Sequence, residues 1–160
     1  MSETAGASPA QEATAEVEAL QKALRAEHAA VYGYGFIGAR SEDGERDRAA
    51  RHLDAHRALR DTVRAELVGL DAVPAPAEAA YTLPESDGRE ELAEFARRME
   101  GTSAQAYLEV AGAAESGPLR GFAAESLQGA TVRALEWGGG LDTFPAYATG
   151  DPDEPNDEDE

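Results

Sequence analysis

The stretch DAVPAPAEAAYTLPESDG, residues 71–88, decides how the helices of this 160-residue chain can be connected. Its prolines at positions 74, 76 and 84 are incompatible with a continuous helix, so an extended, polyproline-like conformation is expected. At about 3.3 Å per residue, a stretch of this length reaches roughly 55–60 Å when extended. The connection is therefore long enough to run the whole length of a helix bundle.

Amphipathic helices are predicted on both sides of this stretch, two before it and two after it. In each of them, apolar side chains recur at steps of three and four residues, which is the helical period. The expected helices cover residues 14–40, 44–70, 89–114 and 118–137. Each is about 30–40 Å long at 1.5 Å per residue. The breaks within the first pair and within the second pair are short, so each pair must form an antiparallel hairpin.

Two hairpins joined by one long crossover form the ferritin-like arrangement of a four-helix bundle. The sequence therefore predicts an all-α fold, a ferritin-like four-helix bundle whose long crossover lies between the second and third helices. In that arrangement the second and third helices are parallel. The alternative is an up-down-up-down bundle with a loose loop over residues 71–88.

Three glycines in VYGYGFIGAR, residues 31–40, spell G-x-G-x-x-G, the fingerprint of dinucleotide-binding folds. That fingerprint requires a strand before it and a helix after it. Here a helical pattern precedes Gly33 and a polar break follows Gly38, so the sequence argues against a dinucleotide site. Each glycine inside a helix costs about 1 kcal/mol relative to alanine. We therefore expect another helix or the crossover to pack closely against these glycines.

The composition and the charge limit the classes of partner. The net charge is −18, and seven of the last ten residues are acidic. Such a surface repels nucleic acid, whereas a basic protein could dock on the acidic tail. There is no cysteine, and no signal or membrane-length apolar stretch is visible, so we expect a cytoplasmic protein without a membrane partner. The expected domains are a disordered segment at 1–13, the bundle at 14–147 and a disordered acidic tail at 148–160.

Polar residues at core positions are the candidates for a functional site. Glu27 occupies a core step of the first helix, and His56 occupies an equivalent step of the second. A buried carboxylate is costly unless it is paired, protonated or bound to a metal. Glu100 on the third helix and Glu125 on the fourth complete a set with one polar group per helix. His28 is instead expected to face a groove or solvent. His52 is expected to lie at the surface.

Several stretches resemble a ferritin-like domain-of-unknown-function family of actinobacterial proteins. They are ALQKALRAEHAAVYGYGFIGAR (19–40), HRALRD (56–61), PAPAEAAYTLP (74–84), RRMEGTSAQAY (97–107) and LQGATVRALEW (127–137). The resemblance implies a four-helix ferritin-like bundle, often dimeric, and no established reaction.

Ferritin-like di-iron proteins use a single glutamate on each of two helices and Glu-x-x-His on the other two. Under the resemblance, Glu27 and Glu100 match the single glutamates. His56 matches a histidine, but Leu53 stands where its glutamate belongs. Glu125 matches the other paired glutamate, but Gln128 replaces its histidine. The matching set falls short of the roughly six protein ligands that a pair of irons uses in this fold.

Two functions remain open at this stage. The first is a structural or interaction protein, a homodimer without a complete di-iron site, in which Glu27 and His56 satisfy each other as a buried pair. The second is a metal-dependent oxidoreductase that uses iron, manganese or another divalent metal. Its ligands would be Glu27, His56, Glu100 and Glu125.

Overall fold

A computed structural model of the chain describes residues 9–140, and the expectations for residues 1–8 and for the acidic tail lie outside this range. The described part contains four helices and no strand: α1 (Pro9–Arg40), α2 (Asp43–Gly69), α3 (Arg89–Ala113) and α4 (Gly117–Glu136). The predicted all-α class is thus confirmed. Three helices begin and end within one residue of their predicted bounds. Only α1 differs, because it starts at Pro9 rather than at residue 14 and so overlaps the segment 1–13 that was expected to be disordered.

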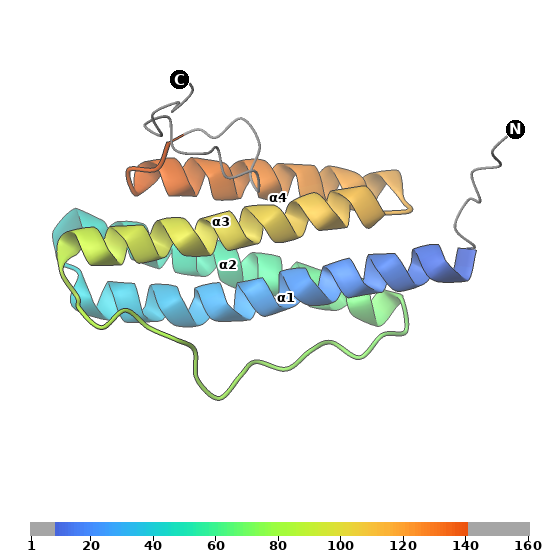
Figure 1. The fold of residues 1–160 in the computed structure, drawn as a ribbon, viewed down its shortest axis with the longest axis horizontal. Helices are drawn as coiled ribbons and strands as arrows, with labels where there is room; N and C mark the ends of the chain where they lie inside the picture. The colour runs from blue at the N-terminus through green and yellow to red at the C-terminus, as the bar shows by residue number, and fades with distance from the viewer. Residues whose placement is uncertain (1–8, 141–160) are drawn as a thin grey trace, which may run out of the picture.

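The helices form two antiparallel hairpins, α1 with α2 and α3 with α4, as Figure 1 shows. The chain leaves α2 at one end of the bundle, runs back to the other end, and only then enters α3 (Figure 1). Consequently α2 and α3 are parallel, and the predicted ferritin-like connectivity is confirmed. The up-down-up-down alternative would need α2 and α3 to be antiparallel.

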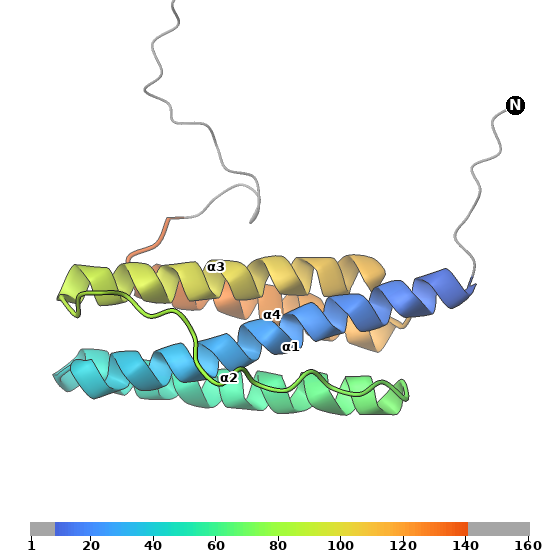
Figure 2. The same cartoon turned by 60° about the horizontal axis from the view of Figure 1, so that its bottom comes forward.

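The crossover is held against α1 by polar contacts, and it passes across that helix in Figure 2. The side-chain amide of Gln21 donates to the carbonyl oxygen of Val73 and accepts from the backbone N–H of Ala75, both at 2.8 Å. His28 Nε2 donates to the carbonyl oxygen of Ala75 at 3.0 Å. His28 is therefore buried beneath the crossover, and an extended segment with no regular partner satisfies part of its backbone through side chains of α1.

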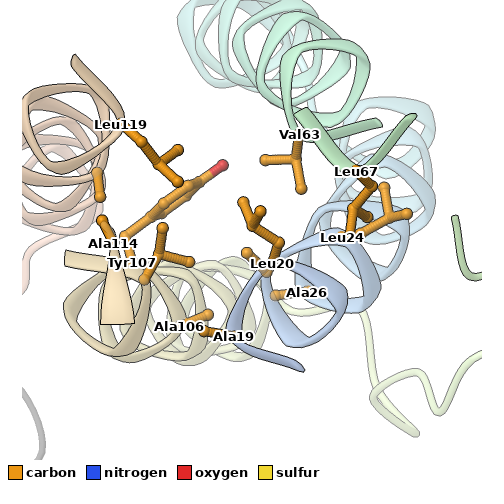
Figure 3. Packing of buried hydrophobic residues seen from close by; sticks show 13 residues of the cluster. Ala19, Leu20, Leu24, Ala26, Val63, Leu67, Ala106, Tyr107, Ala114 and Leu119 are labelled. Atoms are coloured by element: carbon orange, nitrogen blue, oxygen red, sulfur yellow. The ribbon is translucent and has the colours of Figure 1, made fainter. Parts of the chain in front are cut away.

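Two hydrophobic clusters fill the bundle, one toward each end. The larger contains Leu20, Leu24, Val63, Tyr107 and Leu119 (Figure 3). The second is built around Tyr34, Ile37, Met99 and Trp137. Glu27, His56 and Glu100 lie between these clusters along their helices and are completely buried.

Close packing explains only one of the three clustered glycines. A Cβ on Gly33 would collide with the Met99 sulfur and would lie 3.2 Å from the Phe95 ring, so α1 approaches α3 closely here. A Cβ on Gly35 would meet nothing within 4 Å, and one on Gly38 would make ordinary contact with Ala49 at 3.7 Å. The expectation of close approach is confirmed at Gly33 and wrong for Gly35.

These two glycines form a matched pair of substitutions. Gly35→Ala should raise the free energy of unfolding by about 0.5–1 kcal/mol, because alanine is the better helix former and the site is open. Gly33→Ala should be less stable than Gly35→Ala, because Met99 must move to admit the methyl group. Urea unfolding of the two variants beside wild type measures the difference. Equal effects of the two substitutions would contradict the close approach of α3 to Gly33.

Candidate functional site

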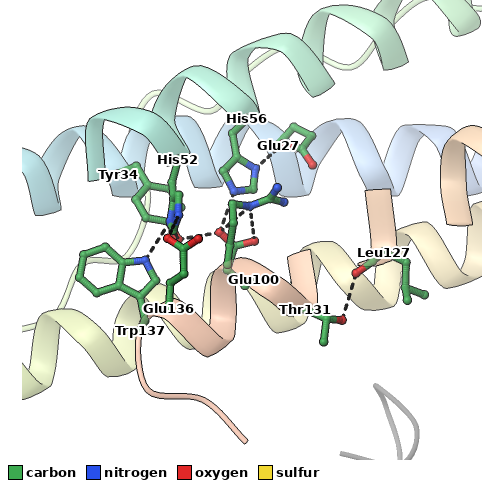
Figure 4. Close-up of polar contacts among 10 residues, drawn as sticks. Glu27, Tyr34, His52, His56, Glu100, Leu127, Thr131, Glu136 and Trp137 are labelled. Carbon is green, nitrogen blue, oxygen red and sulfur yellow. Dashed lines mark hydrogen bonds and ion pairs between the residues drawn. The ribbon is translucent and has the colours of Figure 1, made fainter. Parts of the chain in front are cut away.

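A chain of four charged side chains, one from each helix, crosses the middle of the bundle (Figure 4). Glu27 of α1 contacts His56 of α2, with 2.6 Å between Oε2 and Nδ1. His56 Nε2 lies 3.0 Å from Oε1 of Glu100 on α3. Arg133 of α4 donates from Nε to both oxygens of Glu100, at 3.1 and 3.0 Å. Glu27, His56 and Glu100 are fully buried, so this is an internal ion network.

The contacts fix the protonation of His56. A carboxylate can only accept, so both ring nitrogens of His56 must carry protons, and the side chain is an imidazolium. Burial opposes that charge, but the hydrogen bonds to Glu100 and Glu27 outweigh it and raise the pKa of His56 to about 9. Burial likewise opposes the charge of Glu100, but His56 and then Arg133 hold its pKa below the ordinary value. Two carboxylates thus face two cations, and the network is neutral as a whole.

A second group of polar contacts lies beside the network, toward the end of α4. Tyr34 donates to Glu100 Oε1 at 2.6 Å. Trp137 Nε1 donates to His52 Nδ1, and His52 Nε2 contacts Glu136 Oε2, both at 3.0 Å. Burial lowers the pKa of His52, so this ring is neutral with its proton on Nε2. His52 is 4% exposed, and the expectation that it lies at the surface is therefore wrong.

His52 is in hydrogen-bond contact with Glu136, but no hydrogen bond connects it to the charged network through Tyr34. His52 Nδ1 and the Tyr34 hydroxyl are 3.4 Å apart. The single proton of Tyr34 is directed at Glu100, and the lone pair of His52 Nδ1 already accepts from Trp137. Neither atom has a proton left for the other. The geometry separates the neutral contact between His52 and Trp137 from the charged network in the middle.

The spacing Glu-x6-Tyr occurs on both α1 and α3, as Glu27 with Tyr34 and as Glu100 with Tyr107. These helices run antiparallel (Figure 1), so each tyrosine extends along the bundle from its own glutamate toward the glutamate of the other helix. Tyr34 donates to Glu100. Burial and the charge of Glu27 both raise the pKa of Tyr107 far above its usual value. The core therefore has an approximate twofold pattern, which the spacing in the sequence could have revealed.

The structure brings together three of the four residues proposed from the sequence. Glu27, His56 and Glu100 form the network, whereas Glu125 is exposed on α4 and takes no part in it. Arg133 supplies the α4 side chain instead. It continues the buried stripe of α4, in which positions 119, 123, 126 and 130 precede it and Trp137 follows. That stripe was the signal that could have identified Arg133.

The donor set does not fit a pair of irons. Both nitrogens of His56 are committed to carboxylates, and Arg133 covers both oxygens of Glu100. Leu53 is a half-buried apolar residue at the position where a glutamate would be needed. Gln128, which stands where a histidine would be needed, is exposed. Over residues 9–140 no group of three or more His, Cys, Asp or Glu side chains is arranged to hold a metal ion.

None of the described helices is long and apolar enough to cross a bilayer.

The fold and this site define a ferritin-like four-helix bundle with a carboxylate, histidine and arginine core. Residues 19–149 match the family described as a domain of unknown function (DUF4439), and the chain belongs to that family. The resemblance inferred from the sequence is thereby confirmed. No curated protein matches the chain.

The solved structures that are similar to this one include two bacterial proteins. A conserved hypothetical protein from Mycobacterium tuberculosis is 34% identical, with a TM-score of 0.76, and the match covers 84% of this chain and 99% of that one. A ferritin-like, diiron-carboxylate protein from Bacillus anthracis str. Ames is 17% identical, with a TM-score of 0.71 and coverage of 79% and 95%. The second likeness shows the fold alone.

The charge of His56 makes stability depend on pH in a defined direction. Its pKa rises from 6.5 to about 9 on folding, so its contribution is complete below pH 6.5 and is lost as the pH rises toward 9. That difference corresponds to about 3 kcal/mol. Urea unfolding between pH 6.5 and 9.5 should show this decline, and the double variant Glu27→Leu/His56→Leu, which keeps His28 and His52, should show little of it. A flat wild-type profile would mean that His56 is neutral in the folded protein.

Proposed function

We propose that this protein is a structural or interaction protein built on a ferritin-like bundle, in which an internal ion network takes the place of a metal centre. One observation carries the proposal: the Arg133 guanidinium is bonded to both oxygens of Glu100. An iron ligated by Glu100 would have to displace this guanidinium and take His56 away from its carboxylates. The charges that a metal would neutralise are already neutralised by protein side chains.

Metal content and oxygen uptake test this proposal. The full chain should contain far less than one metal ion per molecule after purification. Anaerobic loading with ferrous iron followed by air should give no rapid oxygen consumption. The double variant Glu27→Leu/His56→Leu is the control, because iron that it still retains is bound adventitiously by the acidic surface.

The competing function is a metal-dependent oxidoreductase that uses iron or manganese. The observation that favours it is Glu27 Oε1, a buried carboxylate oxygen without a partner among the described residues, and carboxylates suit these metals. Stoichiometric iron with rapid oxygen uptake in wild type, both absent in the double variant, would establish this function and overturn the first.

The interaction role requires a surface for a partner, and we propose a second copy of this chain. Large apolar side chains are exposed at the end of α2 and the start of the crossover, namely Val68, Leu70 and Val73. Such clustering is typical of interaction surfaces. Sedimentation of wild type should give a dimer, and the variant Val68→Ser/Val73→Ser should give a monomer. A monomeric wild type would leave docking of a basic protein on the acidic tail as the remaining form of the proposal.

A further inference from the structure

Four atoms beside the ion network are buried and have no hydrogen-bond partner among the described residues. They are Glu27 Oε1, Ser103 Oγ, Tyr107 Oη and Arg133 Nη2. Glu27, Ser103 and Tyr107 are each completely buried. Buried polar groups in folded proteins are almost always paired with protein or with ordered water. Four unpaired atoms around one network therefore indicate a common partner.

The residues that carry these atoms either belong to the ion network or follow Glu100 on α3. Glu27 Oε1 belongs to the carboxylate whose other oxygen contacts His56, and Arg133 Nη2 belongs to the guanidinium whose Nε contacts Glu100. Ser103 and Tyr107 follow Glu100 on the same face of α3, at spacings of three and seven residues. Figure 3 shows the Tyr107 hydroxyl directed into the bundle. The charges of both Glu27 and Arg133 act on this hydroxyl, Glu27 the more strongly.

The chemistry of the four atoms selects the partner. Glu27 Oε1 only accepts, Arg133 Nη2 only donates, and the two hydroxyls can do either. The network is already balanced in charge, so a cation would meet Arg133 and His56, and an anion would meet Glu27 and Glu100. The partner must therefore be small, neutral, and both a donor and an acceptor.

We propose that these four atoms bind one internal water molecule. The water accepts hydrogen bonds from Arg133 Nη2 and from one hydroxyl, and it donates to Glu27 Oε1 and to the other hydroxyl, which gives it four partners. It closes a ring that runs from Glu27 through His56, Glu100 and Arg133 back to Glu27. On the α2 side the imidazole of His56 joins the two carboxylates, and on the α4 side the guanidinium together with the water joins them.

Oxygen-17 magnetic relaxation dispersion of the full chain in labelled water tests the proposal. Wild type should contain one more long-lived water molecule than Ser103→Val, because the added methyl groups occupy the site of the water. Thr102→Val is the matched control, since Thr102 is the exposed neighbour of Ser103 and should leave the number unchanged. Equal numbers in wild type and a folded Ser103→Val would overturn the proposal.

A high-resolution crystal structure of wild type provides a second measurement that does not depend on the variant folding. It should show a water within hydrogen-bond distance of at least three of the four atoms. A structure in which the Tyr107 hydroxyl donates directly to Glu27 Oε1, with no water beside Arg133 Nη2, would refute the proposal.

Discussion

Arg133→Met should lower the free energy of unfolding by about 3–5 kcal/mol, which is the usual loss when one partner of a buried ion pair is removed. Methionine keeps much of the apolar stem but removes the cation from both oxygens of Glu100. The core then holds two carboxylates and one imidazolium, so one negative charge is left without compensation. Urea unfolding followed by circular dichroism measures the loss.

Arg57→Met is the matched control for this prediction, because it makes the same chemical change at an exposed ion pair with Asp54. Exposed pairs contribute about 0–1 kcal/mol, so this variant should remain close to wild type. The stability of Arg133→Lys should fall between those of the two methionine variants, since lysine keeps the charge but lacks the Nε–H that Arg133 shares between both oxygens of Glu100. If Arg133→Met were as stable as Arg57→Met, the ion network would not be what holds α4 against the core.

The sequence predicted the fold well because the decisive signals are local. Helical periodicity, short breaks and the prolines of residues 71–88 are each read within one segment of chain. Together they leave two topologies, and the length of the crossover favours the observed one. Glu27 and His56 could also be identified locally, because each is a polar residue at an apolar step of its helix.

The errors in the predicted site have a common physical origin in contacts between distant segments. His52 looks like a surface residue beside Arg51 and Asp54, but Trp137, which follows α4, covers it. On α4, Glu125 lies next to the buried position 126 and about 100° from it around the helix. That small difference in phase decides between the core and solvent, and only the packing of α3 against α4 settles it.

Arg133 was missed for a different reason. Arginine is rarely buried, so its residue type argues for exposure even though its position lies in the buried stripe between Ala130 and Trp137. Its burial becomes favourable only because Glu100 on α3 offers both oxygens to it. The pattern of α4 marks position 133 as part of the buried stripe, but it does not show which group on another helix compensates the charge.

His56→Leu should be the more damaging of the two single changes at the Glu27–His56 pair. It leaves Glu27 as a buried carboxylate with neither oxygen bonded to a cation, and we expect a loss of about 3–5 kcal/mol in the free energy of unfolding. Glu27→Leu should cost less, about 1–3 kcal/mol, because His56 keeps its contact with Glu100. Chemical unfolding of both variants gives the two values.

The double variant Glu27→Leu/His56→Leu should recover most of the loss caused by His56→Leu. It removes one negative and one positive charge together and leaves Glu100 with Arg133 as a neutral pair. Apolar residues of similar size can replace a buried ion pair at little cost, so the two effects should not add.

The melting temperature of wild type should also be the same with iron, zinc or a chelator. A melting temperature that rises with metal in wild type, and not in either single variant, would instead show that the pair is part of a metal site, by the usual linkage between ligand binding and stability.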